Sequence, residues 1–188
     1  MEANQKAMNN DLLTGKNISI RAMEPGDVDL LYEWENDTSI WQVSNTLTPF
    51  SKFQLKEFVL NAPQDIFSTR QLRLMIDLIH KNQPKETIGA IDFFEYDPFH
   101  LRAGIGILIR RSYREKGYAG EALKILIRYA FETLRLHQLF CNISPDNEPS
   151  IRLFTKAGFV QCGNKKEWNN TGETWNDEWM FQFIHKKS

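Results

Sequence analysis

The chain has 188 residues, of which 41% are hydrophobic and 25% are charged, and its formal net charge at pH 7 is −1. This size and composition are typical of one globular domain with a substantial core, and the near-neutral charge argues against nucleic acid as the main partner. No apolar run approaches the length of a membrane span, and the first residues do not resemble a secretion signal. We therefore expect a cytoplasmic protein without a membrane partner, in which Cys141 and Cys162 are buried, reduced thiols.

Hydrophobic periodicity predicts an α+β domain over residues 16–188, preceded by a flexible polar arm over residues 1–15. The first element is an alternating strand at residues 17–21, which is expected at the edge of a sheet. A helix then begins at Pro25 and ends near Asn36, because proline favours the first helical position.

The remaining elements alternate between strands and helices. A helix at residues 51–61 is capped by Ser51 and is expected to turn its apolar side chains inward, namely Phe53, Leu55, Phe58 and Val59. Further strands are expected at residues 72–79, 87–95, 103–109 and 137–143, and further helices at residues 119–134 and 147–157. A closing hairpin joins residues 159–165 to residues 174–184. Its Trp168, Trp175 and Trp179 are expected in the core, the alternatives being a pocket or the interface of a homo-oligomer.

Between residues 103 and 120, a strand with a bare glycine face runs into a basic loop and a helix start. Gly104 and Gly106 let a ligand or a neighbouring helix approach the strand closely. The first amides of a helix are anion donors, and Gly117 leaves room for a phosphate while Arg114 and Lys116 supply cations. The composition predicts a phosphate-binding turn, the alternative being an ordinary turn followed by solvated charges.

These residues resemble the GNAT acyltransferases. The pattern Arg114-x-x-Gly117-x-Ala119 is similar to the loop with which that family binds the pyrophosphate of acetyl-CoA, and residues 147–159 and 18–27 resemble two further family segments. The resemblance is closest to the spermidine and ribosomal-protein N-terminal acetyltransferases. It implies a mixed, mostly antiparallel sheet with helices on both faces, splayed between the fourth and fifth strands. It also implies transfer of an acetyl group from acetyl-CoA to a primary amine, without a metal.

The resemblance further implies where CoA binds. Its pantetheine arm is expected between the strand at residues 105–109 and the strand at residues 139–143, where the amide of Leu108 or Ile109 polarises the thioester carbonyl. For Asn147 and Ser150 a helix cap is the alternative, and for Asn147 we expect both roles. The residues expected to bind CoA are Ile107, Leu108, Ile109, Arg114, Glu115, Lys116, Gly117, Tyr118, Ala119, Gly120, Asn142, Asn147, Ser150 and Phe154.

The reaction requires an unprotonated amine, so a carboxylate is sought as general base. Asp92 lies between apolar residues and is expected to share a face with Ala90 and Phe94, partly buried and with a raised pKa. A solvated sheet edge is an equally good interpretation of Asp92 and a better one of the looser candidates Glu95 and Asp97.

The usual tyrosine acid of the family is Phe154 here, so Ser144, Tyr118 or a water is expected to protonate the leaving thiolate, unless the thiolate leaves unaided. Gly104 stands where many spermidine acetyltransferases have a glutamate, which weakens the polyamine assignment.

The acceptor is expected to be a polyamine, a diamine or a peptide α-amine. Glu33, Glu35 and Asp37 near Trp41 fit a polyamine site, the alternative being a polar helix end. The departures at Phe154 and Gly104 leave a second hypothesis open, in which the chain is a CoA-binding regulatory or interaction module with weak or no catalysis.

Overall fold

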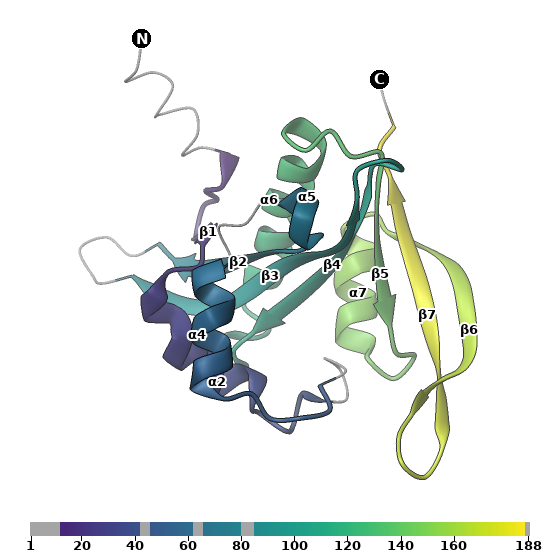
Figure 1. The fold of residues 1–188 in the computed structure, drawn as a ribbon. Helices are drawn as coiled ribbons and strands as arrows, with labels where there is room; N and C mark the ends of the chain where they lie inside the picture. Colours follow the sequence, from purple (N-terminus) through teal and green to yellow (C-terminus); the bar gives the residue numbers. More distant parts are fainter. Residues whose placement is uncertain (1–11, 42–45, 62–65, 80–84, 187–188) are drawn as a thin grey trace.

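The protein is described by a computed structural model that covers residues 12–41, 46–61, 66–79 and 85–186. Its strands form one seven-stranded sheet in the order β1-β2-β3-β4-β5-β7-β6 within these residues (Figure 1). The strands are β1 (Ile18–Ala22), β2 (Leu72–Leu78), β3 (Glu86–Asp97), β4 (Arg102–Ile109), β5 (Gln138–Ile143), β6 (Val160–Asn170) and β7 (Trp175–Ile184). The helices are η1 (Pro25–Asp27), α2 (Val28–Glu35), α4 (Lys52–Asn61), α5 (Ile66–Thr69), η2 (Arg111–Tyr113), α6 (Tyr118–Glu132) and α7 (Glu148–Lys156).

The sheet is split between its fourth and fifth strands, as the resemblance implies. The pair β4 and β5 is parallel, whereas the other neighbouring pairs are antiparallel. Its register covers Arg102–Gly104 on β4 and Gln138–Phe140 on β5. Beyond Gly104 and Phe140 the two strands diverge toward their carboxyl ends (Figure 1). The prediction of a mixed, mostly antiparallel, splayed sheet is confirmed.

Helices cover both faces of the sheet, with α2 and α4 in front and α6 and α7 behind in Figure 1. The front layer is a small cluster made by Leu31, Trp34, Leu55, Val59, Met75 and Ala90. The back layer is the main core, in which α6 buries a stripe at helical spacing that includes Leu123, Leu126 and Ala130. The sheet is therefore packed between two apolar layers.

Three sequence predictions about burial are wrong. On α4, Leu55 and Val59 are buried but Phe53 is 72% exposed and Phe58 lies at the surface, because the helix covers the sheet with one narrow stripe. Trp168 and Trp175 are each 59% exposed on the closing hairpin. Cys162 is also exposed, whereas Cys141 is buried as expected.

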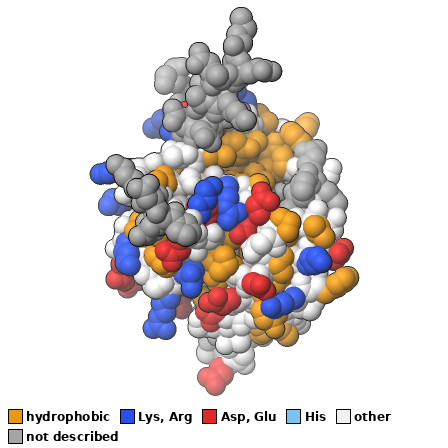
Figure 2. Space-filling model, turned by 90° about the vertical axis from the view of Figure 1, so that its left-hand side faces the viewer, with side chains coloured by type: hydrophobic (Ala, Val, Ile, Leu, Met, Phe, Trp, Pro, Cys, Tyr) orange, Lys and Arg blue, Asp and Glu red, His pale blue; other side chains and the backbone are white. Residues whose placement is uncertain are grey.

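The N-terminal arm predicted over residues 1–15 lies mostly outside the described residues, but its last part packs against the domain. Ile20 donates a backbone hydrogen bond to the carbonyl of Leu13, and Arg128 on α6 donates to the carbonyl of Leu12. Among the residues described, no helix is long and apolar enough to cross a membrane. Acidic and basic side chains are interspersed on the face that Figure 2 shows, in keeping with the near-neutral composition.

An ion-pair network joins β1 to the helix that follows it. Arg21 donates two hydrogen bonds to the carboxylate of Asp27, at 2.7 and 2.9 Å, and a third to Asp77, which is fully buried. Asp27 also accepts the backbone N–H of Glu24 and so caps the helix start. Burial favours protonation of Asp27, but the bonds from Arg21 and Glu24 outweigh it and hold the Asp27 pKa below its usual value.

This network predicts a loss of stability in acid. Because the Asp27 pKa is lowered in the folded state, its contribution is present above the unfolded pKa of about 3.9 and is lost as the pH falls through the folded value. Asp27→Asn is expected to lose about 2 kcal/mol of unfolding free energy at pH 7 and to show a flatter acid limb. Urea unfolding from pH 7 to pH 3 measures both. Asp29→Asn, at an exposed ion pair with Lys52, is the control and should change little.

Candidate active site

A continuous groove of about 2030 Å³ passes through the split in the sheet. It begins beside α6 and α7, crosses the opening between β4 and β5, and ends against Glu35 on α2, Arg73 on β2 and Asp92 on β3. Pockets for one small ligand usually measure about 300–1,000 Å³, so this groove has room for two reactants. The predicted residues that line it are Glu35, Asp92, Ile107, Leu108, Ile109, Arg114, Glu115, Gly117, Tyr118, Ala119, Gly120, Asn142, Asn147 and Ser150.

The phosphate-binding turn predicted before α6 is formed by two residues in the left-handed region, Glu115 at φ 63° and Gly117 at φ 86°. Gly117 is the N-cap of α6, so the amides that follow it point out of the helix without partners in the preceding turn. The Nε of Arg114 donates to the carbonyl of Ile109 at 2.9 Å, which ties the turn to the end of β4. Apart from its chain neighbours and the backbone of its own helix, a Cβ on Gly117 would meet no described atom within 4 Å, so there is open space beside the turn.

The start of α7 borders the same groove. The side chain of Asn147 accepts the backbone N–H of Ser150 at 3.2 Å, and the N–H of Asn147 is held by the carbonyl of Ser144. Asn147 is thus a helix cap that also lines the groove. Ser144 closes this turn and does not line the groove, so the structure does not bring its hydroxyl to the site where an acid was expected.

Phe154 lies outside the groove as well, although the resemblance places it against CoA. One helical turn beyond Ser150, it is buried in the core and packs edge-to-face on Phe159 with ring centroids 5.1 Å apart. Lys116 does not line the groove either, and its ammonium lies over the ring of Tyr113. Tyr118 remains as a hydroxyl at the groove wall.

The two glycines of β4 have different roles. A Cβ on Gly104 would lie 2.2 Å from the ring of Phe94, so the ring on β3 occupies the space that the glycine leaves. A Cβ on Gly106 would lie 3.8 Å from the carboxylate of Asp92, at ordinary contact distance, and Gly106 lines the groove. A ligand or a helix was expected to pack against Gly104, but the Phe94 ring fills that space. At Gly106 the space belongs to the groove.

This difference predicts opposite outcomes for two alanine substitutions. Gly104→Ala is expected to lose about 1–3 kcal/mol of unfolding free energy, because the Phe94 ring is held against Phe140 and must shift. Gly106→Ala should fold with nearly normal stability yet weaken occupancy of the groove. Urea unfolding with and without CoA separates the two effects. Equal loss of stability in both variants would contradict this assignment.

The hydrogen-bond ladder decides which amides of β4 face the opening. The backbone N–H of Arg110 donates to the carbonyl of Ile88 on β3, directly opposite it in the register that pairs Ile109 with Gly89. In an antiparallel pair only every second residue bonds to the neighbouring strand, so Leu108 bonds to β3 as Arg110 does and Ile109 does not. Leu108 therefore turns its amide toward β3, and the amides of Ile107 and Ile109 face β5. The backbone N–H of Leu108 is therefore not available to a thioester carbonyl in the opening, which corrects that prediction. The alternative, the N–H of Ile109, has the required orientation.

The acceptor side of the groove carries a three-residue ion-pair cluster. Arg73 donates to both carboxylate oxygens of Asp92, at 2.8 and 3.0 Å, and to one oxygen of Glu35. Burial by itself lowers the pKa of Arg73, but the charges and hydrogen bonds of Asp92 and Glu35 raise it above its usual value. The three side chains are 18–23% exposed. Asp92 is thus partly buried, as predicted, and is paired with a permanent cation that the sequence did not indicate.

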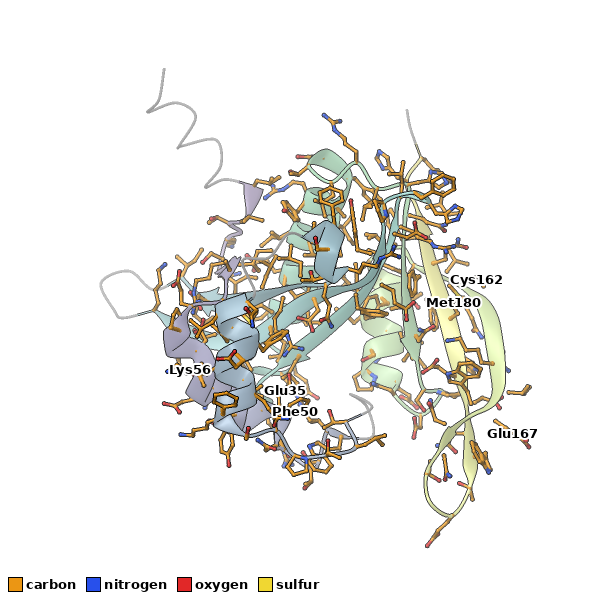
Figure 3. The ribbon with its side chains drawn as sticks, in the orientation of Figure 1. Glu35, Phe50, Lys56, Cys162, Glu167 and Met180 are labelled. Atoms are coloured by element: carbon orange, nitrogen blue, oxygen red, sulfur yellow. The ribbon has the colours of Figure 1, made fainter. Side chains whose placement is uncertain are left out.

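Other predicted acceptor residues are not brought to the groove. Glu33 is exposed and does not line the groove. It lies two residues from Glu35 on the same helix, so the two side chains point in different directions. Trp41 also lies outside the lining and donates its ring N–H to the backbone carbonyl of Glu35. Trp41 therefore holds the end of α2, from which Glu35 projects toward the sheet (Figure 3).

The wall opposite Arg73 has a second charged cluster that the sequence did not indicate. Lys165 on β6 lies opposite Glu178 on β7 and donates to its carboxylate at 2.8 Å and to the side-chain oxygen of Asn142 at 3.1 Å. Its ammonium also lies 4.9 Å from the centre of the Trp168 ring. Glu178 is buried, with 7% exposure. Asn142 was expected on the groove, but its contact with a lysine was not.

No group of three or more histidine, cysteine or acidic side chains suited to a metal ion occurs in the part of the chain that the structure describes. The groove thus combines a helix N-terminus behind the sheet, a split between two parallel strands, and charged side chains in front of the sheet. This combination of features is typical of an acyltransferase.

Comparison with known proteins agrees with this class. A family model described as "Acetyltransferase (GNAT) domain" matches residues 17–160, and the chain belongs to this family. The uncharacterized N-acetyltransferase p20 of Bacillus licheniformis is 26% identical over 177 residues, covering 94% of this chain and 98% of that protein. The spermidine N(1)-acetyltransferase of Vibrio cholerae is 25% identical over 150 residues, covering 80% of this chain and 83% of that one.

Solved structures of acetyltransferases have a similar fold. A crystal structure of spermidine N-acetyltransferase from Vibrio cholerae in complex with CoA and spermine superposes with a TM-score of 0.79 at 22% identity, covering 89% of this chain and 95% of that chain. A GNAT acetyltransferase from Bacillus anthracis superposes with a TM-score of 0.74 at 24% identity, covering 92% of this chain and 97% of that chain. The protein is therefore an acyltransferase of the GNAT family.

Proposed function

We propose that the protein transfers the acetyl group of acetyl-CoA to a primary amine by direct attack of the amine on the thioester. The observation that carries this proposal is the single groove that joins the turn before α6 to the carboxylates of Glu35 and Asp92 through the split. A thioester held from behind the sheet and an amine held in front of it meet in that opening.

The back of the groove has the donors that CoA requires. The amides of Tyr118, Ala119 and Gly120 and the guanidinium of Arg114 suit the pyrophosphate, since a helix start favours negative charge. The amides of Ile107 and Ile109, which face the opening, suit the pantetheine arm and the thioester carbonyl. We assign Ile109 as the donor to the oxygen that becomes negative during attack.

The front of the groove suits a cationic acceptor. The two ion-pair clusters together hold three carboxylates, those of Glu35, Asp92 and Glu178, and two cations, Arg73 and Lys165, so their net charge is negative. This charge attracts an alkylammonium ion. The relatives named as spermidine N-acetyltransferases support a polyamine or diamine, and a peptide α-amine is the other acceptor class that this wall could hold.

A carboxylate of the Arg73 cluster takes the proton of the acceptor amine. The amine loses a proton, its nitrogen forms a bond with the acetyl carbon, and the carbon–sulfur bond breaks to release the CoA thiolate. Because Arg73 takes both oxygens of Asp92 but one oxygen of Glu35, we assign Glu35 as the proton acceptor and Asp92 as the residue that positions Arg73. A thiol of pKa about 8.5 leaves without a strong acid, so the buried Phe154 is compatible with turnover.

Glu35→Gln tests this assignment. It is expected to lower kcat for the acceptor amine by about a hundredfold, since general-base catalysis contributes that much or more. Glu33→Gln is the matched control on the same helix and should retain near-normal turnover, because Glu33 lies outside the groove. Rates are measured by release of the CoA thiol. If Glu33→Gln is the slower variant, the base has been misplaced.

A further inference from the structure

The ammonium of Lys165 is held in the groove as a substrate ammonium would be. It contacts a carboxylate oxygen of Glu178 at 2.8 Å, an amide oxygen of Asn142 at 3.1 Å and the face of the Trp168 ring at 4.9 Å. An anion, a neutral acceptor and an aromatic face are the groups that recognise a primary alkylammonium. The side chain of Lys165 is still 30% exposed, so its amine is accessible from the groove.

The strand register places this amine beside the split. Gly104 pairs with Phe140, so two residues further along Asn142 is level with Gly106, where β4 and β5 have separated. Phe140 packs on Phe94, which shares a face of β3 with Asp92. Asn142 alternates onto the same face as Phe140, so Lys165 approaches the opening from the front, across the groove from Asp92.

We propose that Lys165 is an acetylation site of the protein itself, modified by the acetyl-CoA bound in its own groove. The inference rests on the proposed function, because it uses the same thioester position. The proton of the ammonium passes to the carboxylate of Glu178. The Lys165 nitrogen then bonds to the acetyl carbon, and the carbon–sulfur bond breaks. The second proton of the nitrogen passes to the departing thiolate, which leaves as the CoA thiol.

Acetylation changes the acceptor wall. The amide formed at Lys165 has no positive charge, so Glu178 loses its ion-pair partner. The two clusters are then left with three carboxylates and one cation, Arg73. A more negative wall attracts a cationic acceptor more strongly. The modification therefore primes the groove for a cationic substrate.

The neighbouring Lys166 supplies a control within the same molecule. It points away from the groove, pairs with Asp177 at 2.7 Å and is 75% exposed, against 30% for Lys165. Reagent acetylation from solution follows exposure and favours Lys166. Acetylation by groove-bound acetyl-CoA favours Lys165, by about tenfold or more because the reactants are held together.

The test is to incubate the full chain with acetyl-CoA and no added amine, and to map acetyl-lysine by peptide mass spectrometry over time. We expect Lys165 to be labelled at least about tenfold faster than Lys166, at a rate per molecule that does not depend on protein concentration. Lys165→Arg should remove the fast label, Glu178→Gln should slow it, and Gly117→Glu should abolish it. Labelling of Lys166 at an equal or higher rate, or labelling unaffected by Gly117→Glu, would overturn the proposal.

This outcome is separable from that of the proposed function. Thiol release with an added amine and no fast label at Lys165 rejects the self-acetylation alone. Once the protein has been acetylated, the KM for spermidine is expected to fall if spermidine is an acceptor, and Lys165→Gln, which also removes the charge, should show the same lower KM. A KM unchanged by both would reject the priming role.

Discussion

Replacing Gly117 with glutamate is expected to abolish CoA binding. The new carboxylate would stand in the open space before the first amides of α6, where the proposed site holds the pyrophosphate, and would repel it. The φ of 86° at this position adds strain of about 1–2 kcal/mol for any residue with a Cβ. Thermal unfolding with increasing CoA measures the effect, since a ligand that binds the folded state raises Tm.

The matched control is Gly172→Glu. Gly172 has a φ of 92° and, like Gly117, no atom within 4 Å of an added Cβ, so the substitution introduces the same strain and the same charge away from the groove. It should lower Tm about as much as Gly117→Glu in the absence of CoA and keep the full CoA-induced rise. If Gly117→Glu also keeps that rise, the phosphate site lies elsewhere.

Replacing Arg73 with methionine is expected to have the second largest effect. It leaves Glu35 and Asp92 together without the cation that both contact, and unpaired charges near a core are strongly destabilising. Because the side chains are 18–23% exposed, water screens part of this cost, and we expect a loss of about 1–3 kcal/mol at pH 7.

Urea unfolding at pH 7 tests this expectation, with Arg102→Met as the control because the Arg102 side chain, paired with Asp97, is 47% exposed. Combining Arg73→Met with Glu35→Gln should restore part of the lost free energy, since one of the two repelling charges is removed. A purely additive double variant would show that the two residues are not coupled.

The elements near Gly117 could be predicted from the sequence because their signals are local. A helix start, its glycine cap and the cation Arg114 fall within a few residues, and Asn147 is read as a cap from its spacing to Ser150. The split follows from the resemblance to the family. These predictions required no knowledge of which strands pair.

The acceptor wall could not be predicted in the same way, because it is set by pairing between strands. Arg73 meets Asp92 only through the register of β2 with β3, and Lys165 meets Glu178 through that of β6 with β7. The orientation of the Leu108 amide likewise depends on which residues of β4 bond to β3. Given the pairing of β2 with β3, the alternation of side chains along each strand does put Arg73 and Asp92 on the same face of the sheet.

Errors in burial have a related cause. Counting Phe53 and Phe58 as core residues assumed a wide apolar stripe on α4, whereas a helix on the outer layer buries only the stripe of Leu55 and Val59. The exposed Trp168 was expected in the core for its size, yet its ring lies over the Lys165 ammonium at the groove.

We propose above all that the groove transfers an acetyl group from acetyl-CoA to an amine. The rate of thiol release from acetyl-CoA tests this transfer, measured with spermidine, a diamine or a peptide with a free α-amine against a blank without acceptor. We expect sustained release above the blank with at least one of these amines, and none with Gly117→Glu. If CoA raises Tm but no amine raises the rate above the blank, the chain is a CoA-binding module and not the acetyltransferase proposed.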